Sequence, residues 1–210
     1  MFLKICGITR ATDALHAVDQ GATALGFVLW PRSPRFIDRH RVAAIVALLP
    51  STITTVGVFV NESSDEIART MEVTSLSHVQ LHGDEPTAYA DSLAWPILRS
   101  VTLATADEVA ATWPQDTTLI LDAADIERRG GTGQAVDWSR AAVLAKHRQL
   151  VLAGGLTPAN VGDAIATVRP FGVDVSSGVE DAPGVKNADK VAQFLTNARQ
   201  AMVGERSVRL

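Results

Sequence analysis

Eight short apolar runs alternate with longer segments of helical periodicity from one end of the chain to the other. This alternation limits the fold more than any other feature, because a strand repeatedly followed by a helix gives parallel strands joined by right-handed crossovers. The predicted strands are Phe2–Cys6, Ala24–Leu29, Thr54–Val60, His78–Leu81, Ile97–Val101, Thr118–Asp122, Leu150–Ala153 and Gly172–Ser176. The predicted helices are Thr12–Gln20, Arg41–Leu49, Ser64–Met71, Asp107–Trp113, Trp138–His147, Pro158–Val168 and Ala188–Met202.

Eight units of about 26 residues fit a single (β/α)8 TIM barrel near the lower end of its usual length. The barrel would cover residues 1–210 as one domain, with a frayed tail over the last few residues, 204–210. A doubly wound open sheet is the alternative, because periodicity does not show whether a sheet closes. The number of units and the positions of the polar residues favour the barrel.

The formal net charge of −4 excludes a generally basic surface, so nucleic acid is not an expected partner, although a local anion site is compatible with it. No run approaches the ~20 apolar residues of a membrane helix, and the N-terminus shows no secretion signal. The single cysteine cannot form an internal disulfide. These features predict a cytoplasmic protein in a reducing compartment.

Polar residues recur on one face of the predicted strands, mostly at the C-terminal ends, where barrel enzymes place their active sites. Strand parity assigns the same inner face to Lys4, Cys6, Gln80, His82, Asp122, Asp174 and Ser176. Strands 1 and 8 become neighbours when a barrel closes. We therefore predict a buried ion pair between Lys4 and Asp174, which would support the floor of a site and raise the positive potential near Cys6.

Three strand-end or loop residues are candidates for chemistry, and each has a simpler alternative. Cys6 could be a reactive group, although a free cysteine is commonly a small buried hydrophobe. Asp122 could hold or deliver a proton near neutral pH, although a strand-end aspartate often caps a turn. Arg35, after Pro34, could direct its guanidinium at a carboxylate instead of pointing into solvent.

His82 is the only one of five histidines at a predicted strand end. No cluster of histidine, cysteine and carboxylate residues shows the spacing of metal ligands, so no catalytic metal is expected.

Two glycine-containing loops follow the last two predicted strands, at residues 153–157 and 176–180. Loops at these positions form the usual phosphate site of this fold, because glycine lets the backbone approach a ligand and free N–H groups attract anions. The alternative is that they are only turns. We predict a phosphorylated small-molecule substrate bound by Gly154, Gly155, Ser176, Ser177 and Gly178.

The chain resembles the phosphoribosylanthranilate isomerase family of tryptophan biosynthesis over nearly its whole length. The resemblance rests on short segments in a fixed order: residues 4–9 (KICGIT), 26–28 (GFV), 33–35 (SPR), 57–60 (GVFV), 79–83 (VQLHG), Asp122, 130–133 (GGTG), 152–156 (LAGGL), 173–180 (VDVSSGVE) and 183–186 (PGVK).

The resemblance implies a cofactor-free Amadori rearrangement of N-(5-phosphoribosyl)anthranilate to 1-(2-carboxyphenylamino)-1-deoxyribulose 5-phosphate. Asp122 matches the general acid that opens the sugar ring, and Cys6 matches the general base that removes the C2′ proton. Arg35 matches the arginine that holds the anthranilate carboxylate, while Gln80 and His82 would also bind substrate. A monomer or a homodimer is expected.

Two positions depart from the family pattern. Asn187 stands where aspartate is more usual, and it should still cap the last helix. Trp30 replaces a more usual phenylalanine or tyrosine in the pocket wall.

Other readings place the chain among different phosphosugar barrels or outside enzymes altogether. A resemblance to the histidine-pathway isomerase would require a pair of catalytic aspartates, whereas the residue at the first of these two positions is Cys6. An epimerase would need several metal-binding histidines, and an indoleglycerol-phosphate synthase would need a catalytic lysine at a strand end, whereas Lys4 lies too deep. A non-catalytic barrel that binds a phosphorylated ligand is the alternative from another class.

Overall fold

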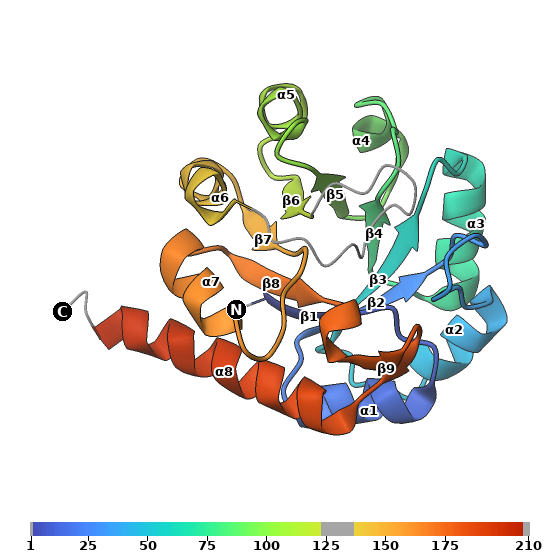
Figure 1. Ribbon diagram of the computed structural model, residues 1–210. Helices are drawn as coiled ribbons and strands as arrows, with labels where there is room; N and C mark the ends of the chain where they lie inside the picture. Colours follow the sequence, from blue (N-terminus) through green and yellow to red (C-terminus); the bar gives the residue numbers. More distant parts are fainter. Residues whose placement is uncertain (1, 123–136, 208–210) are drawn as a thin grey trace.

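The structure is a computed structural model that describes residues 2–122 and 137–207, with side chains described up to residue 201. Eight parallel strands form a closed barrel in sequence order, and the helices are arranged around them (Figure 1). The strands are β1 (Phe2–Cys6), β2 (Ala24–Val28), β3 (Thr54–Phe59), β4 (His78–Leu81), β5 (Ile97–Val101), β6 (Thr118–Leu121), β7 (Leu150–Leu152) and β8 (Gly172–Val175). The prediction of a (β/α)8 barrel rather than an open sheet is therefore confirmed.

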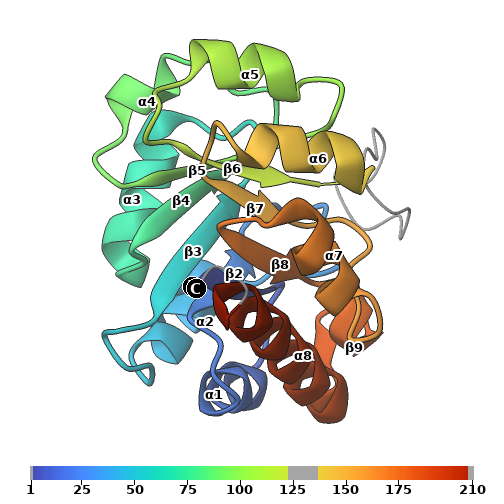
Figure 2. The same cartoon turned by 90° about the vertical axis from the view of Figure 1, so that its left-hand side faces the viewer.

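The helices follow the strands in the expected order. They are α1 (Ala11–Asp19), α2 (Arg39–Val46), α3 (Ser64–Thr74), α4 (Tyr89–Ser92), α5 (Ala106–Thr112), α6 (Trp138–Ala145), α7 (Val161–Val168) and α8 (Ala188–Ser207). Helix α8 packs against both α7 and α1, and Figure 2 shows α7 and α8 side by side. Within the described residues, no helix is both long and apolar enough to cross a membrane.

Local capping signals set several helix starts. Ser63 accepts a hydrogen bond from the Glu66 N–H, and Asp137 accepts one from the Ser139 N–H. Asn187 does the same before α8, where its Oδ1 accepts from the Lys190 N–H at 2.9 Å. Such caps satisfy N–H groups that have no partner inside the helix. The expectation that Asn187 replaces aspartate as a cap is confirmed.

Two apolar cores hold the barrel together. The larger core lies between the strands and the helices, and a smaller one fills the barrel interior. The interior core consists of Val56, Leu98, Ile120, Val151 and Ala153, with Phe2 packed against it. The interior core contains only a few apolar side chains, so the inward polar residues above them form the floor of a site.

Several elements differ from the sequence predictions, and α2 and α3 end three residues from their predicted ends. Helix α4 has only four residues, too few for a periodic pattern, and was not predicted. Helix α7 begins at Val161, so Pro158 lies in the preceding turn rather than in its first turn. That turn is closed by Asn160, whose Oδ1 accepts from the Thr157 N–H at 2.8 Å and whose Nδ2 donates to the Gly155 carbonyl at 3.0 Å.

Helix α8 continues to Ser207, beyond the predicted end at Met202. Residues 204–207, which were expected to belong to a frayed tail, therefore have helical backbone. Residues 208–210 lie outside the described residues, as does the glycine-rich segment 130–133.

An antiparallel hairpin after β8 was not predicted. A 3-10 turn at Ser177–Val179 leads into strands β9 (Glu180–Ala182) and β10 (Val185–Lys186), which pair with each other outside the barrel. These strands are too short for the alternation that identifies a strand in sequence. The hairpin matters because it carries two charged side chains toward the site.

Candidate active site

A cavity of about 600 Å³ opens at the C-terminal ends of the strands. Every site residue predicted from the sequence lines it: Cys6, Arg35, Gln80, His82, Asp122, Gly154, Gly155, Ser176, Ser177 and Gly178. Trp30, one of the two departures from the family pattern, lines its wall. The structure therefore brings together residues from the ends of β1, β2, β4, β6, β7 and β8.

Cys6 is the last residue of β1 and is 8% exposed. Gly26 on the neighbouring strand β2 makes room for it, because a Cβ at that position would lie 2.7 Å from Sγ and 3.0 Å from the Lys4 Cε. Burial raises the pKa of the Cys6 thiol above its ordinary value, and the nearby Asp174 acts in the same direction. Lys4 and Lys186 lower this pKa but do not outweigh the loss of hydration. In the free protein at neutral pH, Cys6 is therefore a neutral thiol.

Lys4 and Asp174 form the predicted buried pair beneath Cys6. The Lys4 Nζ lies 2.9 Å from Asp174 Oδ2, and the Lys4 side chain has no exposure to solvent. Burial alone would lower the pKa of Lys4, but the charges and hydrogen bonds of Asp174 and Cys6 outweigh it and raise that pKa. Lys4 thus carries a fixed positive charge. Lys4 lowers the pKa of Cys6 by more than Asp174 raises it, so the pair adds positive potential at Cys6, as predicted, although less than Lys4 alone would add.

Lys4→Met is expected to destabilise the protein by about 3–5 kcal/mol, because it leaves Asp174 as an unpaired buried charge. The free energy of unfolding from urea titration measures this loss. The double variant Lys4→Met/Asp174→Leu is the control, since replacing both charges by apolar groups should restore most of the stability. A Lys4→Met protein as stable as the wild type would show that the ion pair does not hold the barrel floor.

Asp122 follows β6 directly and faces the cavity. Although the strand ends at Leu121, one residue earlier than predicted, the Asp122 N–H donates to the Val101 carbonyl at 2.9 Å. This bond to β5 fixes the backbone from which the carboxylate projects. Asp122 thus reaches the cavity from β6, while Cys6 reaches it from β1.

His82 is held by two neighbours on β4 and β5. The Gln80 Nε2 donates to Ser100 Oγ at 2.9 Å, and Ser100 Oγ lies 2.7 Å from His82 Nδ1. Because Ser100 accepts from Gln80, its own proton is available for Nδ1. Gln80 Nε2 also lies 3.2 Å from His82 Nδ1, so both neighbours contact the same ring nitrogen.

The loops after β7 and β8 pack directly on each other. Gly154 and Gly155 have φ values of +71° and +70°, a backbone conformation that residues other than glycine rarely adopt. A Cβ on Gly178 would lie 1.9 Å from the Leu156 carbonyl oxygen, so only glycine permits this contact between the loops. Among the described residues, none accepts a hydrogen bond from the N–H groups of Gly155, Ser177 or Gly178. These donors suit an anion at the cavity rim.

Arg35 lines the cavity, but its guanidinium is paired with a residue of the hairpin. The Glu180 carboxylate lies 2.7 Å from Arg35 Nη2. The stem of Arg35 crosses Gly7, where a Cβ would lie 2.7 Å from Arg35 Cδ. Gly7, at φ +75°, thus lets the arginine lie directly beside the end of β1.

Strand parity could have identified one residue that sequence reasoning missed. Ser100 is two positions after the inward-facing Leu98 on β5, so the alternation used for the other strands also places it inward. Glu180 and Lys186 had no such signal, because their positions depend on a hairpin outside the barrel. Within the described part of the chain, no group of three or more histidine, cysteine or carboxylate residues could hold a metal ion.

Comparison with known proteins agrees with this geometry. The family model described as N-(5'phosphoribosyl)anthranilate (PRA) isomerase matches residues 3–197. The chain is 45% identical to the N-(5'-phosphoribosyl)anthranilate isomerase of Trichlorobacter lovleyi over 205 residues, which cover 95% of this chain and 98% of the relative. It is 43% identical to the Pseudomonas fluorescens protein of the same name over 199 residues, which cover 93% and 97% of the two chains.

Solved structures give the same result. The crystal structure of phosphoribosyl anthranilate isomerase from Thermotoga maritima superposes with a TM-score of 0.89 and 38% identity, over 95% of this chain and 99% of that one. The Thermus thermophilus protein of the same name superposes with a TM-score of 0.86 and 38% identity, over the same shares. A further related structure contains a reduced 1-(o-carboxyphenylamino)-1-deoxyribulose 5-phosphate.

Proposed function

The chain belongs to the N-(5′-phosphoribosyl)anthranilate isomerase family and is an aldose–ketose isomerase of tryptophan biosynthesis, and we propose that Cys6 and Asp122 carry out its rearrangement. One observation supports this assignment above the others. A thiol from β1 and a carboxylate from β6 line one cavity, with the glycine loops of β7 and β8 at its rim. An aldose–ketose rearrangement needs an acid and a base acting on neighbouring substrate atoms.

The reaction begins when Asp122 donates a proton to the ring oxygen of N-(5-phosphoribosyl)anthranilate. The bond between C1′ and the ring oxygen breaks, and the nitrogen lone pair forms an iminium at C1′. Cys6, as a thiolate, then removes the proton at C2′, and the electrons of that C–H bond neutralise the iminium to give an enolamine. Protonation at C1′ and loss of the C2′ hydroxyl proton yield the ketone, so no atom is gained or lost.

The iminium explains how a thiol with a raised pKa serves as a base. Asp174 partly offsets Lys4 and burial outweighs the rest, so that pair does not convert the buried thiol into a thiolate. A positive charge forming on the substrate beside Cys6 favours the thiolate, so the thiol releases its proton to solvent through the open cavity, and the same charge makes the C2′ proton acidic. The base therefore becomes effective only when the ring has opened.

Substrate is held at both ends while its sugar reacts. The N–H groups of Gly155, Ser177 and Gly178 would bind the phosphate, and Arg35 would bind the carboxylate of the anthranilate ring. We place this reaction in the cytoplasm, because a free thiol persists in a reducing compartment. The Thermotoga maritima relative is described as dimeric and also as monomers, and a monomer or homodimer remains the prediction for this chain.

Turnover is the direct test. Anthranilate derivatives fluoresce, so purified protein added to freshly made N-(5-phosphoribosyl)anthranilate should cause a fluorescence change at a rate proportional to protein concentration. The expected product is 1-(2-carboxyphenylamino)-1-deoxyribulose 5-phosphate, identified by mass and by its ketone. The same substrate incubated without protein serves as the control. Absence of turnover in the folded wild-type protein would contradict the proposed function.

A further inference from the structure

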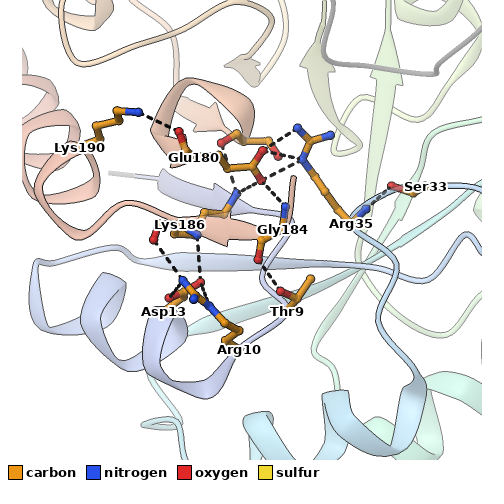
Figure 3. Close-up of polar contacts among 10 residues, drawn as sticks. Thr9, Arg10, Asp13, Ser33, Arg35, Glu180, Gly184, Lys186 and Lys190 are labelled. Carbon is orange, nitrogen blue, oxygen red and sulfur yellow. Dashed lines mark hydrogen bonds and ion pairs between the residues drawn. The ribbon is translucent and has the colours of Figure 1, made fainter. Parts of the chain in front are cut away.

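Glu180 forms the centre of a buried charge cluster next to the cavity (Figure 3). Its Oε1 accepts hydrogen bonds from Lys186 Nζ at 2.8 Å and from the Gly184 N–H at 3.1 Å. Its two oxygens accept from Arg35 Nε at 2.9 and 3.1 Å, and Oε2 accepts from Nη2 at 2.7 Å. Glu180 does not line the cavity itself, so it can act on a ligand only through its neighbours.

The pairing with Glu180 occupies one particular edge of the guanidinium. An arginine has five N–H donors in a planar fork, and Glu180 uses the edge formed by Nε and Nη2. The other edge, formed by Nη1 and the second N–H of Nη2, remains available for a second carboxylate. Among the described residues, none accepts a hydrogen bond from Nη1, and Arg35 lines the cavity.

We propose that Glu180 is a positioning residue that holds Arg35 by one edge and thereby presents its other edge to the carboxylate of the substrate's aromatic ring. This inference rests on the proposed function, because it takes that carboxylate as the ligand. Arg35 and Glu180 are separated by 145 positions in the sequence, and the contact forms only because the hairpin folds back over the loop after β2.

Glu180 is itself rigidly held, which is what a positioning residue requires. The Gly184 N–H and Lys186 Nζ, both from the hairpin, donate to Oε1 of Glu180. Arg35 Nε donates to the same oxygen. Lys186 is anchored in turn, because its N–H donates to Asp13 Oδ2 at 3.1 Å and its Nζ donates to the Ser176 carbonyl at 3.3 Å. A long arginine side chain without such an anchor would have to be ordered by the substrate, which weakens binding.

The charges in this cluster also favour a second anion. Arg35 is positive, and burial lowers the pKa of Lys186 below its ordinary value although Glu180 works to raise it. Among the described residues, Glu180 is the one carboxylate that pairs directly with both cations. Burial works to raise the pKa of Glu180, but its hydrogen bonds and charge interactions with Arg35 and Lys186 outweigh this effect, so the carboxylate stays ionised. With Lys186 protonated, the group of three carries one excess positive charge, which the carboxylate of a bound substrate would balance.

The test compares two ligands in each variant. The first is the reduced product analogue with its ring carboxylate, and the second is the same compound without that carboxylate; calorimetry gives both dissociation constants. In wild type the carboxylate is expected to improve binding at least about tenfold, as for a charge-assisted contact. Glu180→Gln should reduce this preference by about three- to tenfold while changing binding of the second compound by less than about twofold.

A double-mutant cycle of Glu180→Gln with Arg35→Ala shows whether Glu180 acts through Arg35 or only stabilises the fold. Arg35→Ala should abolish the preference, and adding Glu180→Gln to Arg35→Ala should change it by no more than about twofold. With substrate, Glu180→Gln should raise KM and leave kcat within about threefold, because the carboxylate is bound equally in the ground and transition states.

Asp13→Asn is the matched control. Asp13 is a buried carboxylate that anchors the same hairpin through Lys186 and Arg10, but it does not contact Arg35. Asp13→Asn should lower thermal stability and keep the preference for the ring carboxylate. If Glu180→Gln does not fold, Glu180→Asp replaces it, since that variant keeps a negative charge near Lys186 and withdraws the carboxylate from Arg35.

Each outcome has a distinct meaning. Wild type that binds neither compound contradicts the proposed function together with this inference. Wild type that prefers the carboxylated compound, combined with an undiminished preference in the Glu180 variants, overturns the role of Glu180 alone. Loss of the preference in Asp13→Asn as well would overturn it too, because any loosening of the hairpin would then suffice.

Discussion

Cys6→Ser is expected to lower kcat by about 10²- to 10⁴-fold, the usual contribution of a positioned general base. Serine has nearly the same shape as cysteine, so the barrel should fold and bind substrate as before. A hydroxyl, however, is far less acidic than a thiol and does not form an anion at accessible pH. The expected result is therefore a loss in kcat with KM changed only slightly, measured by fluorescence turnover.

Binding of the reduced product analogue is the control for Cys6→Ser, and its dissociation constant should stay within about twofold of wild type. A variant that keeps half or more of the wild-type kcat would contradict the assignment of Cys6 as the base.

The same residue gives an independent pH experiment. Cys6 is the only cysteine in the chain, so the rate of alkylation by iodoacetamide reports on this thiol alone. The thiolate is the reactive form, and burial raises the pKa of Cys6 above its ordinary value of 9.0. The rate should therefore increase with pH and still be increasing above pH 9.0. A plateau near neutral pH would show that the cations around Cys6 outweigh its burial.

Asp122→Asn is expected to lower kcat by a comparable factor of about 10²–10⁴, because an amide cannot deliver a proton to the ring oxygen. Asparagine matches aspartate in shape and can keep the backbone bond to Val101, so the fold should not change. Fluorescence turnover measures the loss, and an unchanged melting temperature is its control.

Substrate deuterated at C2′ distinguishes the roles of Asp122 and Cys6. Ring opening should limit the rate of Asp122→Asn and suppress the isotope effect, whereas removal of the C2′ proton should limit the rate of Cys6→Ser and leave a large one. The reverse pattern would exchange the two roles. Equal isotope effects in the two variants would contradict a division of labour between them.

Much of the fold follows from local pattern in the sequence. The alternation of short apolar runs with helical segments predicted all eight barrel strands, with ends that differ from the structure by at most one residue. Strand parity then predicted that Lys4 and Asp174 share the barrel interior, and the register of β1 on β8 places them opposite each other. Such predictions succeed because the period of a strand and the order of parallel crossovers are properties of neighbouring residues.

The site was less accessible to the same reasoning. Strand-end position and glycine spacing identified residues that line one cavity, from Cys6 on β1 to Gly178 after β8. The link between Arg35 and Glu180 was missed, because it joins the loop after β2 to a short hairpin outside the barrel, and neither segment has a periodic signal in the sequence. Ser100 was missed only because parity was not applied to β5.

The sequence by itself determined the barrel, the end of it at which the polar residues gather, and the pairing of Lys4 with Asp174. Only the tertiary structure decided that the hairpin holds Arg35 by one edge and that Cys6 remains a neutral thiol. The physical reason is that periodicity and parity act along a strand, whereas desolvation and ion pairing depend on everything that surrounds a group in space. The pKa of the Cys6 thiol depends on its burial and on Lys4, Asp174 and Lys186, and these three residues come from different segments of the chain.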